Sequence, residues 1–150
     1  MLAGFIGRRS GKLGQVDYDN WSITLNINLL EPARVSAAFV DNVLASQQKK
    51  LVTIATRISS LTERTSVDFF AYRSSKAAVN MMTKLAANEL GPKGATVVLL
   101  HPGWVKTELG GPRATTPAKE SVWAMRAVLE NLTSADNGRF INFDGSTIPW

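Results

Sequence analysis

The chain has 150 residues, 45% of them hydrophobic and 19% charged, so it can bury a core and is not an intrinsically disordered segment. With no cysteine and one histidine it forms no disulfide and offers no Cys/His zinc site, and its net charge of +5 is scattered, unlike that of a nucleic-acid-binding patch. The sequence shows neither a signal peptide nor an apolar run long enough to span a membrane, so we expect a single cytoplasmic domain that binds neither nucleic acid nor membrane.

The first half of the chain is predicted to form a loop, a helical stretch and a strand. Residues 4–17 contain four glycines among polar residues and are predicted to form a loop. Apolar residues recur every three or four positions over 18–46, which indicates helix, and Pro32 is expected to break or kink that helix. The apolar, β-branched run 51–56 predicts a buried strand, followed by a polar loop.

The second half is predicted to alternate between helices and strands. The elements are a helix over 71–90 that stops at Gly91–Pro92, a strand over 95–101, a helix over 117–132 capped by Thr116, and a strand over 139–145 after the Asn137–Gly138 turn. The strands are continuously apolar and helices connect them, which is typical of an α/β fold with a parallel sheet covered on both faces. Ligands of such sheets bind beyond the carboxyl ends of the strands, here after positions 56, 101 and 143.

Tyr72 and Lys76 are the first candidates for chemistry. They are four residues apart in the predicted helix, so they lie on one helix face. A phenol with its ordinary pKa of about 10 exchanges protons poorly at neutral pH. The nearby ammonium is expected to lower the pKa of Tyr72 and so to make it a general acid–base. The same spacing is common on solvated helix faces, so the pair alone does not define a site.

Hydroxyl groups follow the strand at 51–56. Thr56 ends the strand, and Ser59 and Ser60 lie on the loop after it. A hydroxyl at this edge of the sheet could polarise a carbonyl substrate. Serines in such a loop are also ordinary turn residues.

The strand at 95–101 continues into "HPGWVKT", where Pro102 and Gly103 allow the backbone to approach a flat ring closely. Together with "AYRSSKAAVNMMTKLAANEL", this segment resembles the Tyr-x-x-x-Lys helix and the Pro-Gly-x-Val-x-Thr loop of the short-chain dehydrogenase/reductase family. The ending "GRFINFDGSTIPW" is similar to that of its C-factor and sniffer-like carbonyl reductase branch, and "NINLLEP" and "MLAG" resemble its Asn-bearing segment and Asn-Asn-Ala-Gly turn. The resemblance covers essentially the whole chain. It implies the C-terminal part of a Rossmann-like, doubly wound parallel sheet.

The resemblance implies a role for each matching residue in hydride transfer between NAD or NADP and a small carbonyl or alcohol. Tyr72 would be the acid–base, and Lys76 would lower its pKa and hold the nicotinamide ribose. Asn28 would anchor a water that links Lys76 to solvent as a proton relay. The nicotinamide would lie against the loop residues Pro102, Gly103, Val105 and Thr107.

The catalytic serine of the family has no direct counterpart. The branch ends its strand in Ile-Ser-Ser, whereas this chain has Ile54-Ala55-Thr56, sixteen residues before Tyr72. Thr56 retains a hydroxyl and is the first candidate for that role. Ser60, twelve residues before Tyr72, is the second.

The opening strand of the family and its Gly-x-x-x-Gly-x-Gly turn, which would bind the pyrophosphate, have no counterpart in this sequence. We therefore expect a single partial domain over 1–150, with the strand 51–56 exposed at the sheet edge. Such a chain is either a nicotinamide-dependent reductase or a truncated, non-catalytic dimerisation module. The resemblance also implies a homodimer or tetramer that pairs through the helices at 32–46 and 72–90.

Overall fold

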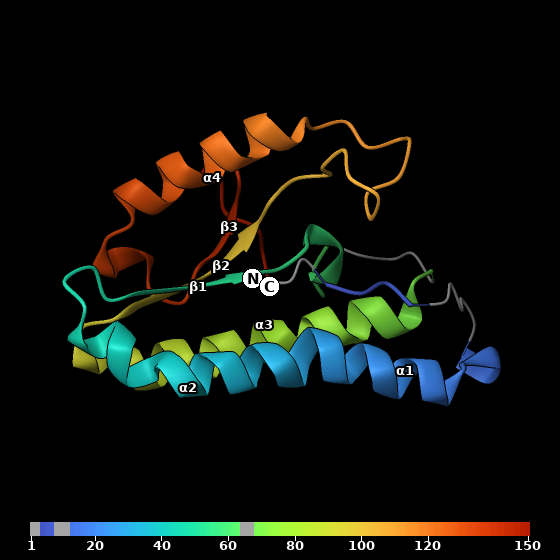
Figure 1. Ribbon diagram of the computed structural model, residues 1–150, viewed down its shortest axis with the longest axis horizontal. Helices are drawn as coiled ribbons and strands as arrows, with labels where there is room; N and C mark the ends of the chain where they lie inside the picture. Colours follow the sequence, from blue (N-terminus) through green and yellow to red (C-terminus); the bar gives the residue numbers. More distant parts are fainter. Residues whose placement is uncertain (1–3, 8–12, 64–67) are drawn as a thin grey trace.

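The computed structural model describes residues 4–7, 13–63 and 68–150. Helices and strands alternate in the predicted order: α1 (Tyr18–Leu25), α2 (Glu31–Ala45), β1 (Lys50–Ile54), α3 (Phe70–Leu90), β2 (Thr96–His101), α4 (Ala118–Asn131) and β3 (Phe140–Asn142). Helices α1 to α3 lie on one face of the sheet and α4 lies on the other (Figure 1). Within these residues, no helix combines the length and the apolar character needed to cross a bilayer.

The three strands form one parallel sheet in the order β1-β2-β3. β2 is the central strand, and its residues Val97, Val98, Leu99 and Leu100 are fully buried. Continuous burial is what a strand covered on both faces requires. Parallel strands joined by helices confirm the predicted α/β, Rossmann-like arrangement. The carboxyl ends of the strands therefore meet at one edge of the sheet, where α3 begins.

Successive residues of β2 pack against opposite layers, as the pleat of a strand demands. Leu99 packs with Val79 of α3 and with Phe140, whereas Leu100 packs with Ile141 and the inner face of α4. Each fully buried side chain of this size stabilises the fold by about 1.5–3 kcal/mol. The packing of Val79 fixes α3 on the sheet, and with it the first turn of α3 that carries Tyr72.

Of the break or kink expected at Pro32, the break is wrong, because the helical stretch continues through it. Pro32 lies in the first turn of α2, where a missing N–H is tolerated. The irregularity lies just before it, in the π-helical segment Asn26–Leu30, where the Glu31 N–H donates to the Asn26 carbonyl. π-helical turns are rare and often occur at functional positions. Asn28 stands at the centre of this one.

Thr116 does not cap α4, contrary to the prediction. Pro117 is the N-cap of α4, with no side-chain cap hydrogen bond. Thr116 instead forms an isolated bridge with Val105 across the loop between β2 and α4. The backbone of Thr116 is therefore used to close that loop and not to start the helix.

Candidate active site

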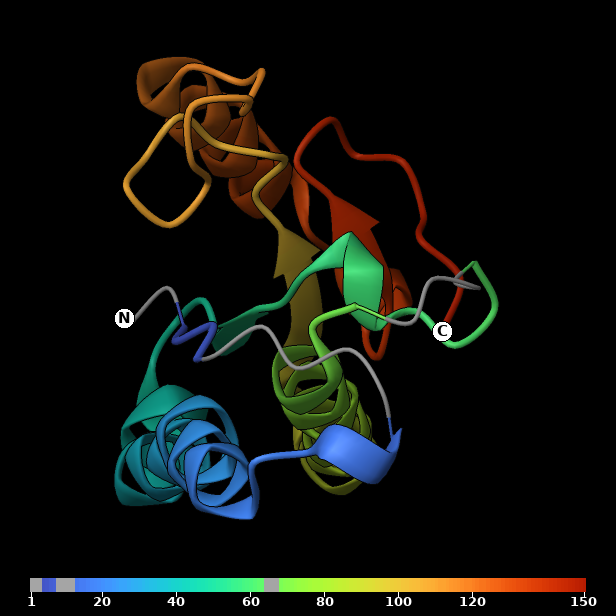
Figure 2. The ribbon, with the colours of Figure 1, turned by 90° about the vertical axis from the view of Figure 1, so that its right-hand side faces the viewer.

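Thr56 and Tyr72 come together at the carboxyl edge of the sheet, which faces the viewer in Figure 2. β1 ends at Ile54, two residues before its predicted end, so Thr56 lies on the loop that leaves the sheet. α3 brings Tyr72 back to the same edge in its first turn. The fold thereby joins two residues that are sixteen positions apart in the sequence.

Tyr72 is buried, with 7% of its surface exposed. Burial raises the pKa of Tyr72 above its ordinary value of 10.0, and the Thr56 side chain acts on the phenol to lower that pKa, which partly opposes this rise. The phenol therefore keeps its proton at neutral pH. This is the protonation state that a proton donor needs.

Lys76 lies one turn further along the same face of α3 and is 3% exposed. Within the described part of the chain its ammonium donates one hydrogen bond, to the Ile54 carbonyl at 3.4 Å. Burial lowers the pKa of Lys76 from 10.5 to about 8. Lys76 is not among the groups that shift the pKa of Tyr72. Burial is the largest cause of the shift for both groups, so the lowering of the Tyr72 pKa by Lys76 stays a prediction.

Asn28 is 1% exposed and uses its whole side chain to join two segments. Its Oδ1 accepts from the Phe5 N–H at 2.7 Å, and its Nδ2 donates to the Phe5 carbonyl at 2.8 Å and to Ser75 Oγ at 2.9 Å. Ser75 Oγ in turn donates to the Tyr72 carbonyl at 2.8 Å. The backbone carbonyl of Asn28 lacks its ordinary α-helical donor, because the residue four positions on is Pro32.

Gly4 lies directly against this part of the site. A Cβ atom at Gly4 would stand 3.0 Å from Lys76 Cε, 3.1 Å from Lys76 Nζ and 3.3 Å from Asn28 Oδ1. The φ angle of Gly4 is +103°, which residues with a side chain rarely adopt. The backbone therefore favours glycine at this position, and an added Cβ would also require the Lys76 side chain to shift by a few tenths of an ångström.

Gly4→Ala is expected to lower the free energy of unfolding by about 1–3 kcal/mol, because it adds both backbone strain and a clash with Lys76. Gly111 has a φ of +72° and open space around it, so Gly111→Ala tests strain alone and is expected to have an effect of about 1 kcal/mol. Gly14 has open space and no positive φ, so Gly14→Ala is expected to change stability by less than about 0.5 kcal/mol. Urea unfolding of the three variants measures these differences. Equal losses in Gly4→Ala and Gly111→Ala would show that the contact with Lys76 places no demand on position 4.

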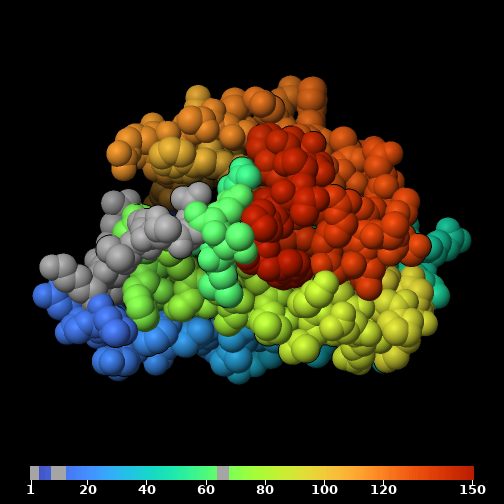
Figure 3. All heavy atoms as spheres, turned by 180° about the vertical axis from the view of Figure 1, so that it is seen from behind, coloured from blue at the N-terminus to red at the C-terminus, as the bar shows by residue number. Residues whose placement is uncertain are grey.

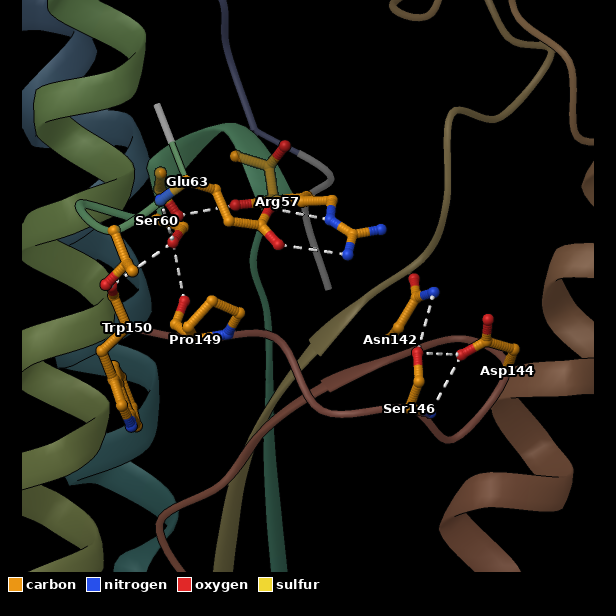
Figure 4. A network of polar contacts seen from close by, with 11 residues as sticks. Arg57, Ser60, Glu63, Asn142, Asp144, Ser146, Pro149 and Trp150 are labelled. Atoms are coloured by element: carbon orange, nitrogen blue, oxygen red, sulfur yellow. Dashed lines mark hydrogen bonds and ion pairs between the residues drawn. The ribbon is translucent and has the colours of Figure 1, made fainter. Parts of the chain in front are cut away.

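Ser60, the second candidate for the serine role, is turned toward the C-terminal segment (Figure 4). Its Oγ donates to the Pro149 carbonyl at 2.7 Å and to the Trp150 carbonyl at 3.3 Å, and accepts from the Glu63 N–H at 3.2 Å. The space-filling view shows the C-terminal residues, in red, packed against the green segment that contains Ser60 (Figure 3). The side chain that acts on Tyr72 is instead that of Thr56.

The loop after β2 contains the four residues predicted to lie against a nicotinamide, Pro102, Gly103, Val105 and Thr107. At Gly103 φ is +84°, and a Cβ there would stand 3.1 Å from the Phe143 ring and 3.2 Å from Thr116 Oγ1. The bridge between Val105 and Thr116 closes the loop. Thr107 is exposed, and its Oγ1 accepts from the Gly110 N–H at 3.1 Å. The loop is therefore preformed, with a hydroxyl at its surface.

These residues fit the nicotinamide half of a dinucleotide. An ammonium carries three N–H donors, and the hydrogen bond to Ile54 uses one, so Lys76 retains donors for ribose hydroxyls. The sequence contains no Gly-x-x-x-Gly-x-Gly turn for the pyrophosphate. Over the ranges that the structure describes, no three His, Asp or Glu side chains are grouped as metal ligands.

Sequence reasoning missed two buried polar residues beside the site, Ser75 and Asn80. Ser75 connects Asn28 to the Tyr72 carbonyl, and Asn80 donates to Ser59 at 2.9 Å. Asn80 follows Lys76 at the same spacing at which Lys76 follows Tyr72. That repeated four-residue spacing was the available signal.

Comparison with known proteins agrees with these motifs. The family model described as enoyl-(acyl carrier protein) reductase matches residues 1–143. Among curated proteins, the C-signal of Myxococcus xanthus is 41% identical over 138 residues, which cover 92% of this chain and 83% of that protein.

Solved structures match over almost the whole chain. The carbonyl reductase Sniffer of D. melanogaster superposes with a TM-score of 0.88 at 26% identity, over 98% of this chain and 63% of that one. An NADPH-bound carbonyl reductase from chicken fatty liver gives a TM-score of 0.87 at 28% identity, over the same shares of the two chains. The chain thus spans a little under two thirds of the length of these structures.

Proposed function

The chain belongs to the short-chain dehydrogenase/reductase family, and we propose that it transfers hydride between a nicotinamide dinucleotide and a small carbonyl or alcohol. Both solved structures compared above are described as carbonyl reductases, and one of them as NADPH-bound. The observation that carries the proposal is the pair of buried side chains, Tyr72 and Lys76, one helical turn apart on one face of α3, with Thr56 acting on Tyr72.

In the reduction direction, the Tyr72 hydroxyl donates its proton to the carbonyl oxygen of the substrate. The raised pKa of Tyr72 keeps that proton in place at neutral pH. The Thr56 hydroxyl polarises the same carbonyl oxygen and stabilises the phenolate that forms as the proton leaves. We assign this role to Thr56 and not to Ser60, because Ser60 Oγ donates to the Pro149 carbonyl.

Lys76 and Asn28 return the proton to Tyr72. A pKa of about 8 lets the Lys76 amine exchange a proton close to neutral pH. The Asn28 carbonyl, whose α-helical donor is lost at Pro32, is the acceptor that we propose for a relay water between Lys76 and solvent. Gly4 approaches both residues, since a Cβ there would stand 3.1 Å from Lys76 Nζ and 3.3 Å from Asn28 Oδ1.

A bound NAD or NADP would supply or accept the hydride at the substrate carbon. Lys76 would hold the nicotinamide ribose through its remaining N–H donors. The nicotinamide and its amide would lie against the preformed loop after β2, at Pro102, Gly103, Val105 and Thr107.

Helices α2 and α3 support a second proposal, that the chain pairs with further copies as a homodimer or tetramer. Four large apolar side chains on these helices are between 57% and 61% exposed: Val35, Phe39, Met81 and Leu85. A groove of about 570 Å³ lies between the two helices, and Met81 and Leu85 are among the residues that line it. Exposed apolar surface of this kind marks interfaces. The same surface supports the alternative function, a non-catalytic dimerisation module.

For either function we propose a cytoplasmic location. Cell fractionation tests this location.

Titration with reduced nicotinamide cofactors distinguishes the two functions. We expect NADPH, NADH and reduced nicotinamide mononucleotide to quench or enhance fluorescence saturably, with Kd values between about 10 µM and 1 mM. Because the described site fits the nicotinamide half, the mononucleotide should bind within about tenfold of NADPH, or about 1.4 kcal/mol. Lys76→Met should weaken all three. Absence of saturation, with dimers seen by sedimentation velocity on the same samples, would establish the dimerisation module instead.

A further inference from the structure

Asn80 extends the row formed by Tyr72 and Lys76 by one further turn of α3. The three residues follow one another at four-residue spacing, so they share one helix face. All are buried, with exposed fractions of 7% for Tyr72, 3% for Lys76 and 5% for Asn80. Asn80 has no part in the proposed proton transfer. Because a buried amide is costly unless it is hydrogen-bonded, its partner indicates what it does.

A chain of hydrogen bonds joins the Asn80 amide to the backbone of Thr56 through Ser59. Asn80 Nδ2 donates to Ser59 Oγ at 2.9 Å, and both residues are buried. Ser59 Oγ donates to the Thr56 carbonyl at 2.6 Å, and the Ser59 N–H donates to the same carbonyl at 3.0 Å. The Ser59 hydroxyl has one proton, and the amide donor of Asn80 leaves that proton directed at Thr56.

The amide of Asn80 has one described use. Its Oδ1 is buried and finds no partner among the residues that the structure describes. The bond from Nδ2 to Ser59 is therefore what favours an amide over an apolar residue at this position.

These contacts connect Thr56 to the helix that carries Tyr72. The path runs from the Thr56 carbonyl through Ser59 and Asn80 into α3, and the Thr56 side chain acts on Tyr72 at the other end of that helix face. Thr56 is the second residue after the end of β1 at Ile54. Its backbone is extended, with φ −141° and ψ 139°. The direction of its carbonyl defines ψ, so the two donors of Ser59 fix how Thr56 is oriented.

We propose that Asn80 and Ser59 are positioning residues that fix the orientation of Thr56, and so of its hydroxyl, beside Tyr72. The proposal rests on the proposed function, which makes Tyr72 the acid–base and Thr56 its hydroxyl partner. Neither residue touches the reacting atoms. Support of this kind, from groups behind those that contact the substrate, is what keeps a site in its productive geometry.

The ionisation of Tyr72 provides a readout that needs neither cofactor nor substrate. The chain has two tyrosines, so Tyr18→Phe leaves Tyr72 as the one phenol, which can be titrated by phenolate absorbance or by NMR of ¹³Cζ-labelled tyrosine. The Thr56 side chain lowers the pKa of Tyr72, so the loss of its hydroxyl moves the midpoint to higher pH. Asn80→Ala and Ser59→Ala are each expected to produce at least half of the displacement that Thr56→Val produces.

Two controls separate positioning from general loosening of the fold. Ser59→Thr keeps the hydroxyl and should restore the midpoint of the parent chain. Thr83→Val removes another buried hydroxyl of α3, one with no partner among the described residues, and should leave the midpoint unchanged. In a Thr56→Val background, Asn80→Ala should add no further displacement, because the hydroxyl that it positions is already gone.

The positioning role is overturned if Asn80→Ala moves the midpoint no further than Thr83→Val, or if it adds its full displacement in the Thr56→Val background. Should Asn80→Ala fail to fold, Ser59→Ala gives the same test, since it removes a single oxygen atom. If Thr56→Val itself leaves the midpoint unchanged, both the positioning role and the Thr56–Tyr72 contact of the proposed function are rejected. If the midpoint moves in Thr56→Val but not in Asn80→Ala or Ser59→Ala, the positioning role alone is rejected.

Discussion

Replacing Tyr72 with Phe is expected to lower the rate of nicotinamide-dependent carbonyl reduction by about 10²- to 10⁴-fold, the usual contribution of a positioned acid–base. The phenyl ring of the variant keeps the packing of Tyr72, a residue that is only 7% exposed. The variant loses one hydroxyl, so its free energy of unfolding should fall by only about 0.5–1.5 kcal/mol. The rate of NADPH oxidation with a panel of aldehydes and ketones measures the effect.

The chain provides a matched control for this substitution. Tyr18 is the other tyrosine and is 69% exposed on α1. Tyr18→Phe makes the same chemical change away from the site and should leave the rate unchanged. A Tyr72→Phe variant that stays folded and retains the parent rate would remove Tyr72 from the acid–base role.

Lys76→Met is expected to stabilise the fold at neutral pH and to change how stability depends on pH. Below about pH 8 the amine is protonated in both states, so the folded chain carries the cost of a buried ammonium. Between about pH 8 and 10.5 the unfolded chain binds one proton more than the folded chain, so the free energy of unfolding rises with pH. The parent should therefore gain about 2 kcal/mol between pH 7 and 9.5 relative to Lys76→Met.

Tyr72 limits the useful range of this measurement. Its pKa is raised in the folded chain, so above pH 10 the unfolded chain loses the phenol proton first and stability falls again. Urea unfolding should therefore be compared at pH values up to 9.5. Lys119→Met, which removes an exposed lysine of α4, is the control and should track the parent. Parallel pH profiles for the parent and Lys76→Met would show that the Lys76 amine is not desolvated.

The layers of the fold could be predicted because they depend on local pattern. The run Val97–Leu100 is apolar at every position, as a strand buried on both faces must be, and the structure buries all four residues. Pro32 was misread for a physical reason. Proline disrupts the interior of a helix but is accepted in the first turn, and a π-helical segment upstream of that turn creates a new start at Glu31.

The candidate site could be predicted only where spacing along one element places the residues. Tyr72 and Lys76 were found because they are neighbours on one helix face. The choice between Thr56 and Ser60 was left open, since it depends on the docking of Pro149, which lies 89 positions away from Ser60. Burial raises the pKa of Tyr72, and the spacing of Tyr72 and Lys76 could not show that burial, because it depends on how α3 packs on the sheet.

Transfer of label from NADPH that is deuterated at both C4 positions tests the central claim most directly. The chain should convert an aldehyde or ketone to an alcohol that carries one deuterium at the former carbonyl carbon, as measured by mass spectrometry of a single turnover. Tyr72→Phe should form about 10²- to 10⁴-fold less of this alcohol in the same time. Label that remains on the cofactor after it has bound to the parent chain, or an equal yield from Tyr72→Phe, would contradict the account.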